Sequence, residues 1–216
     1  MEKLFSLLSI ALVIASYPYI IYNYKTLPDQ LPVHINLSGE IDKYMSKGII
    51  FAFPILLTIL FASFKIVPKF DKYESNYNKF LTEMRLFEFA TLSFFSYVAY
   101  LLIELSRHTE FDLIMKLMPA LGLLMIICGF VSDRSKMTQF FGCKCRYAYT
   151  SEENWETINK MGGAIMIVSG VAMLIGFCIN MKMMLFVSVG VLIAGVLAVM
   201  GYSEIKMRNE NKVKAQ

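Results

Sequence analysis

The sequence has little charge and few of the residue patterns that enzymes use for catalysis. Asp, Glu, Lys and Arg make up 18% of its 216 residues, whereas an ordinary soluble domain carries about 25%. It contains no metalloprotease helix motif, no phosphate-binding glycine loop and no serine nucleophile elbow. These absences argue against a soluble domain and against the common hydrolase and nucleotide-binding classes. We therefore assign no catalytic residue and expect a non-enzymatic protein.

Cysteine and histidine are also scarce, with four and two residues respectively. Cys128 and Cys178 lie in apolar runs, where cysteine packs as a small hydrophobic residue. Cys143 and Cys145 form a C-x-C pair, but a structural zinc site normally has four ligands. No histidine or third cysteine is near this pair in the sequence. We expect no metal there, no disulfide and no cofactor.

Long apolar runs are what the sequence has in abundance. Hydrophobic residues make up 56% of the chain, and its mean hydropathy is +0.54. Runs of about 18 apolar residues are long enough to cross a membrane as helices. The predicted fold class is therefore all-α, a polytopic membrane protein with six transmembrane helices. The expected spans are Leu4–Tyr24, Gly48–Ile66, Phe87–Leu105, Leu113–Val131, Gly163–Ile179 and Met183–Tyr202.

The positions of Lys and Arg predict the orientation of these spans, since basic residues are enriched on the cytoplasmic side. If the N-terminus is cytoplasmic, fifteen Lys and Arg residues lie on the inner side and five on the outer side. Both termini are therefore expected in the cytoplasm, and the segment 25–47 is expected outside. The net charge of +4 follows from this bias and gives no case for direct nucleic acid binding.

Three units are expected along the chain. Residues 1–66 form two spans joined by the outer loop 25–47. Residues 67–131 hold an inner amphipathic helix and the third and fourth spans, and residues 132–216 hold a second inner loop and the last two spans. The amphipathic helix would lie at the lipid headgroups or extend the third span. It is predicted from apolar residues spaced three and four apart: Phe70, Tyr73, Tyr77, Phe80, Leu81 and Met84.

The outer loop is predicted to be extended and without regular secondary structure. Pro28 and Pro32 exclude a regular helix and favour polyproline-like geometry. Loops of this length are often functional, although a spacer that caps the bundle is the alternative. His34 has the acids Asp29, Glu40 and Asp42 close in sequence, which leaves open either a hydrogen-bonding role or a metal ligand.

The second inner loop carries a helix start signal. Thr150-Ser151-Glu152-Glu153 resembles a capping box that opens a helix, and we expect a short helix with Trp155 near the membrane interface. Gly162 and Gly163 are expected to mark a bend into the fifth span.

Ionisable residues inside a bilayer are functional candidates. Here these are Glu88, Glu104 and Lys116. Lys116 would pair with Glu104 or extend to the outer headgroups.

Two stretches together resemble a known family. "LPDQLPVHINLSGEIDKYMSK", residues 27–47, resembles the signature loop of a small bacterial domain of unknown function found at the N-terminus of SdpI-like membrane proteins. "FGCKCRYAYTSEENWETINKMGG", residues 141–163, is similar to the C-terminal signature of that family. The second stretch departs from the pattern at Lys144, at Arg146-Tyr147 and at Asn159. Its matching positions are Gly142, Ser151, Glu152, Glu153, Trp155, Gly162 and Gly163.

The resemblance implies an integral protein of the bacterial plasma membrane that gives immunity to a secreted toxic peptide. It also implies signal transduction through a transcriptional repressor recruited from the cytoplasm. The outer loop would then recognise the peptide through Pro28, Asp29, Pro32, His34, Asn36, Gly39, Glu40, Asp42 and Lys47. The inner loop would meet the cytoplasmic partner through Gly142, Lys144, Glu152, Glu153, Trp155, Gly162 and Gly163.

Two other functions remain open from the residues alone. A transporter or exporter of small solutes or peptides is suggested by Glu104 and Lys116, and by Pro54 and Pro119, which should kink their spans. A membrane metalloprotein is suggested by His34 and its neighbouring acids.

Overall fold

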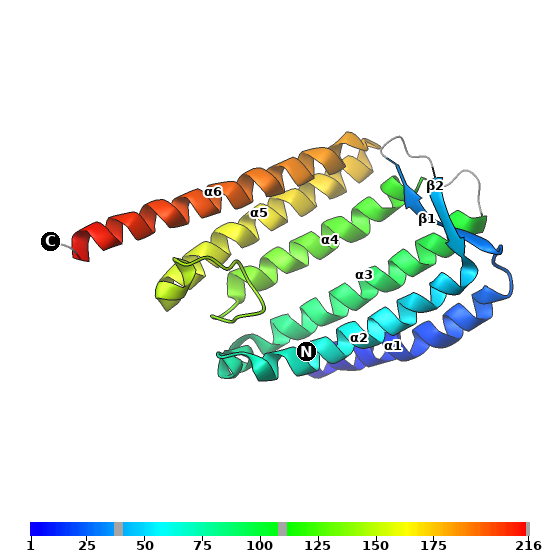
Figure 1. The fold of residues 1–216 in the computed structure, drawn as a ribbon, viewed down its shortest axis with the longest axis horizontal. Helices are drawn as coiled ribbons and strands as arrows, with labels where there is room; N and C mark the ends of the chain where they lie inside the picture. The colour runs from blue at the N-terminus through cyan, green and yellow to red at the C-terminus, as the bar shows by residue number, and fades with distance from the viewer. Residues whose placement is uncertain (37–40, 108–111, 215–216) are drawn as a thin grey trace.

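The fold is a bundle of six long helices that run back and forth along one axis (Figure 1). The computed structural model describes residues 1–36, 41–107 and 112–214. All six helices, some with a short 3-10 segment at one end, are long and apolar enough to cross a membrane. The predicted all-α class with six spans is confirmed, and the cytoplasmic placement of the termini stays a prediction. The helices are α1 (Glu2–Tyr24), α2 (Ala52–Ile66), α3 (Leu81–Arg107), α4 (Leu113–Arg134), α5 (Glu152–Cys178) and α6 (Met183–Lys214).

Glycine pairs bring α4 and α5 into close contact. A Cβ atom on Gly129 would lie 2.4 Å from the carbonyl oxygen of Gly163, and one on Gly122 would lie 2.8 Å from that of Gly170. Small residues of this kind let membrane helices approach closely. The short separate helix expected before the fifth span is absent, because α5 is one helix from Glu152 to Cys178. Gly163 therefore serves close helix packing.

The outer loop is a β-hairpin, and the prediction that it lacks regular structure was wrong. Strand β1 (Gln30–Ile35) pairs antiparallel with β2 (Ile41–Ser46). Pro32 is tolerated because the sheet has only two strands, both of them edges, and because the pairing register shifts between Pro32 and His34. Gly39 and Glu40 lie outside the described residues.

The hairpin rests on a small apolar core of its own. Leu27 and Leu31 are buried against Ile20 of α1, Ile50 of the 3-10 helix η1 (Lys47–Phe51), and Ile103 of α3. Burying each of these side chains contributes about 1.5–3 kcal/mol. The hairpin is therefore fixed to the end of the bundle where α1 ends and α2 begins (Figure 1).

The inner segment after α2 is not a separate amphipathic helix at the headgroups, but its second half extends the third span, as the other predicted form had it, since Glu74–Arg107 is one helical run. It folds as two 3-10 helices, η2 (Val67–Phe70) and η3 (Glu74–Phe80), and α3 then begins at Leu81. Tyr77 and Phe80 are buried with Met84 and Val131, so these aromatic side chains pack into the bundle rather than face lipid.

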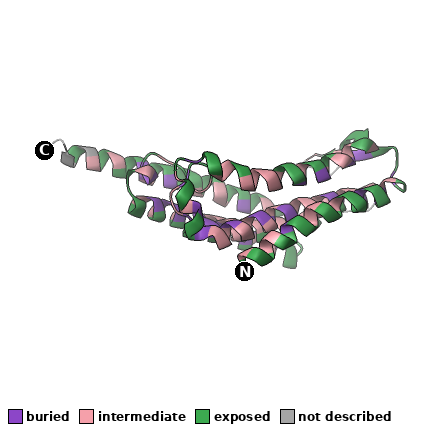
Figure 2. Ribbon diagram, turned by 90° about the horizontal axis from the view of Figure 1, so that it is seen from below, coloured by how far each residue is buried: buried purple, intermediate pink, exposed green. Residues whose placement is uncertain are grey.

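Helix α6 lies at the edge of the bundle, beside α5. Most residues of α6 between Met183 and Glu210 are exposed, and Figure 2 colours the whole ribbon by burial, with exposed residues in green. Gly195 packs against Ile165 of α5, whereas a Cβ on Gly190 would meet no atom within 4 Å. Most of the apolar surface of α6 is therefore open to its surroundings, which for a membrane span is lipid.

Candidate functional site

The outer surface of the hairpin carries a cross-strand polar pair. The ring Nδ1 of His34 on β1 lies at hydrogen-bond distance from Oδ1 of Asp42 on β2. Both side chains are largely exposed, at 61% and 45% respectively. Every residue of β2 from Asp42 to Ser46 is exposed. The hairpin therefore displays polar side chains on a fixed backbone.

A second pair closes the base of the hairpin. The Lys47 ammonium lies 3.0 Å from the Asp29 carboxylate, and the Lys47 backbone N–H donates to the Asp29 carbonyl at 2.9 Å. Beneath it, the Arg107 guanidinium of α3 donates to the Asn23 side-chain oxygen at 2.8 Å and to the Thr26 hydroxyl at 2.7 Å. We call these contacts of Arg107 with Asn23 and Thr26 the hairpin anchor. It was not predicted from the sequence, because nothing in the spacing of these residues links them.

The sequence-predicted outer residues divide into exposed and supporting positions. Pro28 and Asp29 are exposed, Pro32 is buried and Asn36 is half-buried. Tyr44 and Met45 on β2 are exposed large side chains that were not among the predicted recognition residues. Asp42 and Tyr44 are two residues apart on β2 and lie on one face of the hairpin, whereas Met45 lies on the other. A contact surface there would combine His34, Asp42 and Tyr44.

No metal centre is evident in the described ranges 1–36, 41–107 and 112–214, where no three His, Cys, Asp or Glu side chains cluster closely enough to hold an ion. The His34–Asp42 pair supplies two candidate ligands, and Glu40, which the metal alternative also used, lies outside these ranges.

The inner signature is organised around the buried side chain of Asn159. Its Oδ1 accepts from the Cys143 backbone N–H at 2.7 Å and from the Ser132 hydroxyl at 3.1 Å, and its Nδ2 donates to the Trp155 carbonyl at 3.0 Å. Gly142 has φ +96°, and a Cβ there would lie 2.6 Å from this Oδ1. The turn at residues 142 and 143 therefore needs both a glycine and the Asn159 amide.

Trp155 differs from its expected position at the membrane interface. The indole is 1% exposed, and its N–H donates to the Ser135 carbonyl at 3.1 Å. Trp155 is therefore a core residue of this inner structure, and in this conformation a partner would not touch it. A Cβ on Gly162 would lie 2.2 Å from the Cys143 sulfur, so Gly162 also serves packing.

The exposed members of the inner signature include its charged residues and Ser151. Lys144, Glu152 and Glu153 all face outward, and Lys144 donates to the Gln139 carbonyl at 3.1 Å. The predicted helix start is confirmed, and its N-cap is Ser151, whose hydroxyl accepts from the Asn154 N–H at 3.1 Å. Partner contact on this loop would therefore be polar.

A buried aspartate joins this loop to the segment after α2. The carboxylate of Asp71 accepts from the Tyr77 hydroxyl at 2.7 Å, the Tyr73 N–H at 2.8 Å and the Gln139 N–H at 2.7 Å. The Asn76 amide also donates to the Met137 carbonyl at 2.9 Å. Sequence reasoning missed Asp71, although an acid between aromatic residues is a weak signal of such a role. The two inner segments therefore form one surface.

The three intramembrane charges have different surroundings. Glu88 is fully buried, and its carboxylate is held by the Lys65 ammonium at 2.8 Å and the Arg85 guanidinium at 2.7 Å. Glu104 lies 3.6 Å from Arg107, and the Lys116 carbonyl accepts from the Tyr97 hydroxyl at 3.1 Å. Glu88 thus ties α2 to α3, whereas Glu104 lies beside the hairpin anchor.

Two family models match the chain. Residues 134–203 match the SdpI/YfhL protein family, and residues 4–58 match a domain of unknown function, DUF1648. No curated protein and no solved structure matches. The first range covers the inner signature with α5 and most of α6, and the second covers α1 and the hairpin. The resemblance drawn from the two signatures is therefore confirmed.

Proposed function

We propose that this chain, a multi-pass membrane protein of the SdpI immunity family, protects the cell that carries it from a secreted toxic peptide. Protection would come from binding rather than from a chemical reaction. The match to the SdpI/YfhL family supports immunity as the general role. The observation that carries the proposal is the hairpin, a rigid polar surface at the end of the bundle opposite both termini.

Peptide recognition would use the open side of the hairpin. Strand β2 pairs with β1 alone among the described residues, and its side chains from Asp42 to Ser46 are exposed. An extended peptide can pair with such a free strand edge through its main chain. His34, Asp42 and Tyr44 would then add side-chain specificity.

Signalling would use the opposite end of the bundle. The loop anchored by Asn159 and the segment anchored by Asp71 form one surface there, with Lys144, Glu152 and Glu153 exposed. With both termini in the cytoplasm, this surface would meet a membrane-recruited repressor.

A survival assay tests the proposal. A toxin-sensitive bacterium would carry the wild type, the outer variant His34→Ala/Tyr44→Ala, or the inner variant Lys144→Ala/Glu152→Ala, each at matched membrane level. Cells would be exposed to candidate secreted peptides. We expect the wild type and the inner variant to protect and the outer variant to lose protection, because the altered side chains are exposed and do not support the fold.

The survival results distinguish peptide recognition by the hairpin from the alternative mechanisms. No protection by well-inserted wild type against any peptide of this class would overturn the immunity role. Loss of protection in the inner variant alone would move the mechanism to the other end of the bundle and leave the hairpin as a structural cap.

A further inference from the structure

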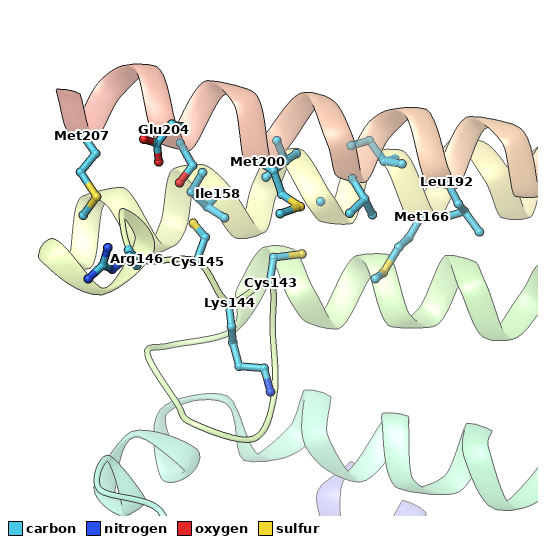
Figure 3. Close-up of a pocket in the computed structure, with 15 residues that line it drawn as sticks. Cys143, Lys144, Cys145, Arg146, Ile158, Met166, Leu192, Met200, Glu204 and Met207 are labelled. Carbon is cyan, nitrogen blue, oxygen red and sulfur yellow. The ribbon is translucent and has the colours of Figure 1, made fainter. Parts of the chain in front are cut away.

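A cavity of about 480 Å³ lies between α5, α6 and the loop of residues 143–146 (Figure 3). Its volume falls within the roughly 300–1,000 Å³ of typical ligand pockets. Of the residues assigned to the polar inner surface, Lys144 lines this cavity, but the apolar space itself has no part in the proposed immunity role.

The walls of the cavity are apolar and elongated. Ile158 and Ile165 line it from α5, and Leu192, Val196 and Met200 line it from α6. The lining of α6 continues to Met207, which corresponds to about 22 Å along a helix rising 1.5 Å per residue. Val196 and Met200 are also 55% and 59% exposed, so the cavity is a groove that opens toward the lipid side of α6.

One end of the groove carries an unpaired cation. Arg146 is exposed, and in the part of the chain that the structure describes it makes no hydrogen bond or ion pair. Figure 3 shows it at the same end of the groove as Glu204 and Met207. Glu204 is bound by Arg208 at 3.0 Å, and Lys144 is bound to Gln139, which leaves the Arg146 guanidinium as the available charge.

We propose that this groove binds one anionic phospholipid of the surrounding leaflet. An acyl chain would lie against Ile165, Val196 and Met200. The phosphate of a net negative headgroup, which has no ammonium beside it to neutralise its charge, would bind Arg146. The guanidinium fork suits phosphate oxygens, and basic pockets between membrane helices are a known form of lipid recognition. The site is independent of the proposed immunity role, because it uses neither the hairpin nor a soluble partner.

Native mass spectrometry of the purified full chain tests the site. The protein in detergent would be titrated with phosphatidylglycerol or with phosphatidylcholine of identical acyl chains. We expect the wild type to retain one phosphatidylglycerol with about tenfold preference, the size expected for a charge-assisted contact. Arg146→Gln should bring the two lipids to parity, whereas Lys160→Gln, an exposed cation at the same end of α5 that does not line the groove, should change nothing.

A second pair of variants tests the groove itself. Val196→Trp fills the space and should lower retention of both lipids, whereas Leu197→Trp, an exposed neighbour outside the lining, should leave retention unchanged. Equal retention of the two lipids by the wild type would overturn the proposal. An unchanged preference in Arg146→Gln, or unchanged retention in Val196→Trp, would do the same.

Discussion

The buried carboxylate of Asp71 accepts the backbone N–H of Gln139 at 2.7 Å, although 68 residues separate the two in sequence. The same carboxylate holds Tyr73 and Tyr77 of its own segment. One side chain therefore fixes the segment after α2 against the inner signature loop. Asp71 lies between the two matched regions, residues 4–58 and 134–203, whereas Gln139 lies inside the second, so this contact joins the unmatched middle of the chain to the SdpI region.

We expect Asp71→Asn to destabilise the protein by about 1–3 kcal/mol, since an amide cannot accept all three hydrogen bonds as strongly as a carboxylate and places an N–H₂ against a donor. Thermal unfolding in detergent measures the loss, and limited proteolysis should show faster cleavage between residues 135 and 150. Glu74→Gln, an exposed acid in the same segment, is the matched control. Equal stability of Asp71→Asn and the control would show that the Asp71 contacts contribute nothing.

Gly142 should tolerate no side chain. Its φ of +96° is unfavourable for other residues, and a Cβ would lie 2.6 Å from Asn159 Oδ1 and 2.8 Å from the Trp155 ring. We expect Gly142→Ala to cost about 2 kcal/mol or more of unfolding free energy. Gly201→Ala is the control, because a Cβ there meets nothing within 4 Å. A thermal shift for Gly142→Ala no larger than that of the control would contradict this account of the turn.

The six spans were predictable from the sequence because the length and hydropathy of an apolar run are enough to identify a membrane helix. The two signatures were also recognisable, and the start of a helix at Thr150-Ser151-Glu152-Glu153 was correctly assigned. The hairpin was missed because proline normally argues against a strand, and the exception here depends on an edge position and a register shift that only the fold reveals.

The role of signature residues was less predictable than their identity. Trp155 and Gly162 were assigned to partner contact, yet their surroundings make them packing residues. A sequence motif shows which residue type occurs at a position but not what the side chain does there. Whether the side chain is buried in the structure distinguishes a packing role from contact with a partner. The ion pair between Glu88 and Lys65 could not be predicted from the sequence either, because Lys65 lies on another helix, 23 residues away.

Glu88→Gln should be among the most destabilising single changes in the bundle. It leaves the Lys65 ammonium and the Arg85 guanidinium facing each other without their shared anion. Breaking a buried ion pair costs about 3–5 kcal/mol, and partial exposure of both cations places the expected loss near the lower value. Glu156→Gln removes an exposed pair with Lys136 and should cost about 1 kcal/mol or less. Chemical denaturation of both variants measures the two losses of unfolding free energy. Equal losses would show that the burial of Glu88 does not increase the contribution of its ion pairs to stability.

Stability should fall in alkaline solution through the inner loop. Burial raises the pKa of the Cys143 thiol, and burial, followed by the charge of Asp71, raises the pKa of the Tyr149 hydroxyl. Each raised pKa means that the folded state holds the proton more tightly than the unfolded state. The resulting stabilisation is complete below the unfolded pKa, about 8.5 for a cysteine, and is lost as the pH rises through the folded value.

Thermal unfolding of the wild type and of Cys143→Ala between pH 7 and pH 10 separates this effect from the titration of other groups. We expect the difference in stability between the two proteins to shrink above about pH 8.5, since only the wild type has this thiol to ionise. A constant difference between wild type and Cys143→Ala across this range would mean that the Cys143 thiol ionises equally well in the folded and unfolded states.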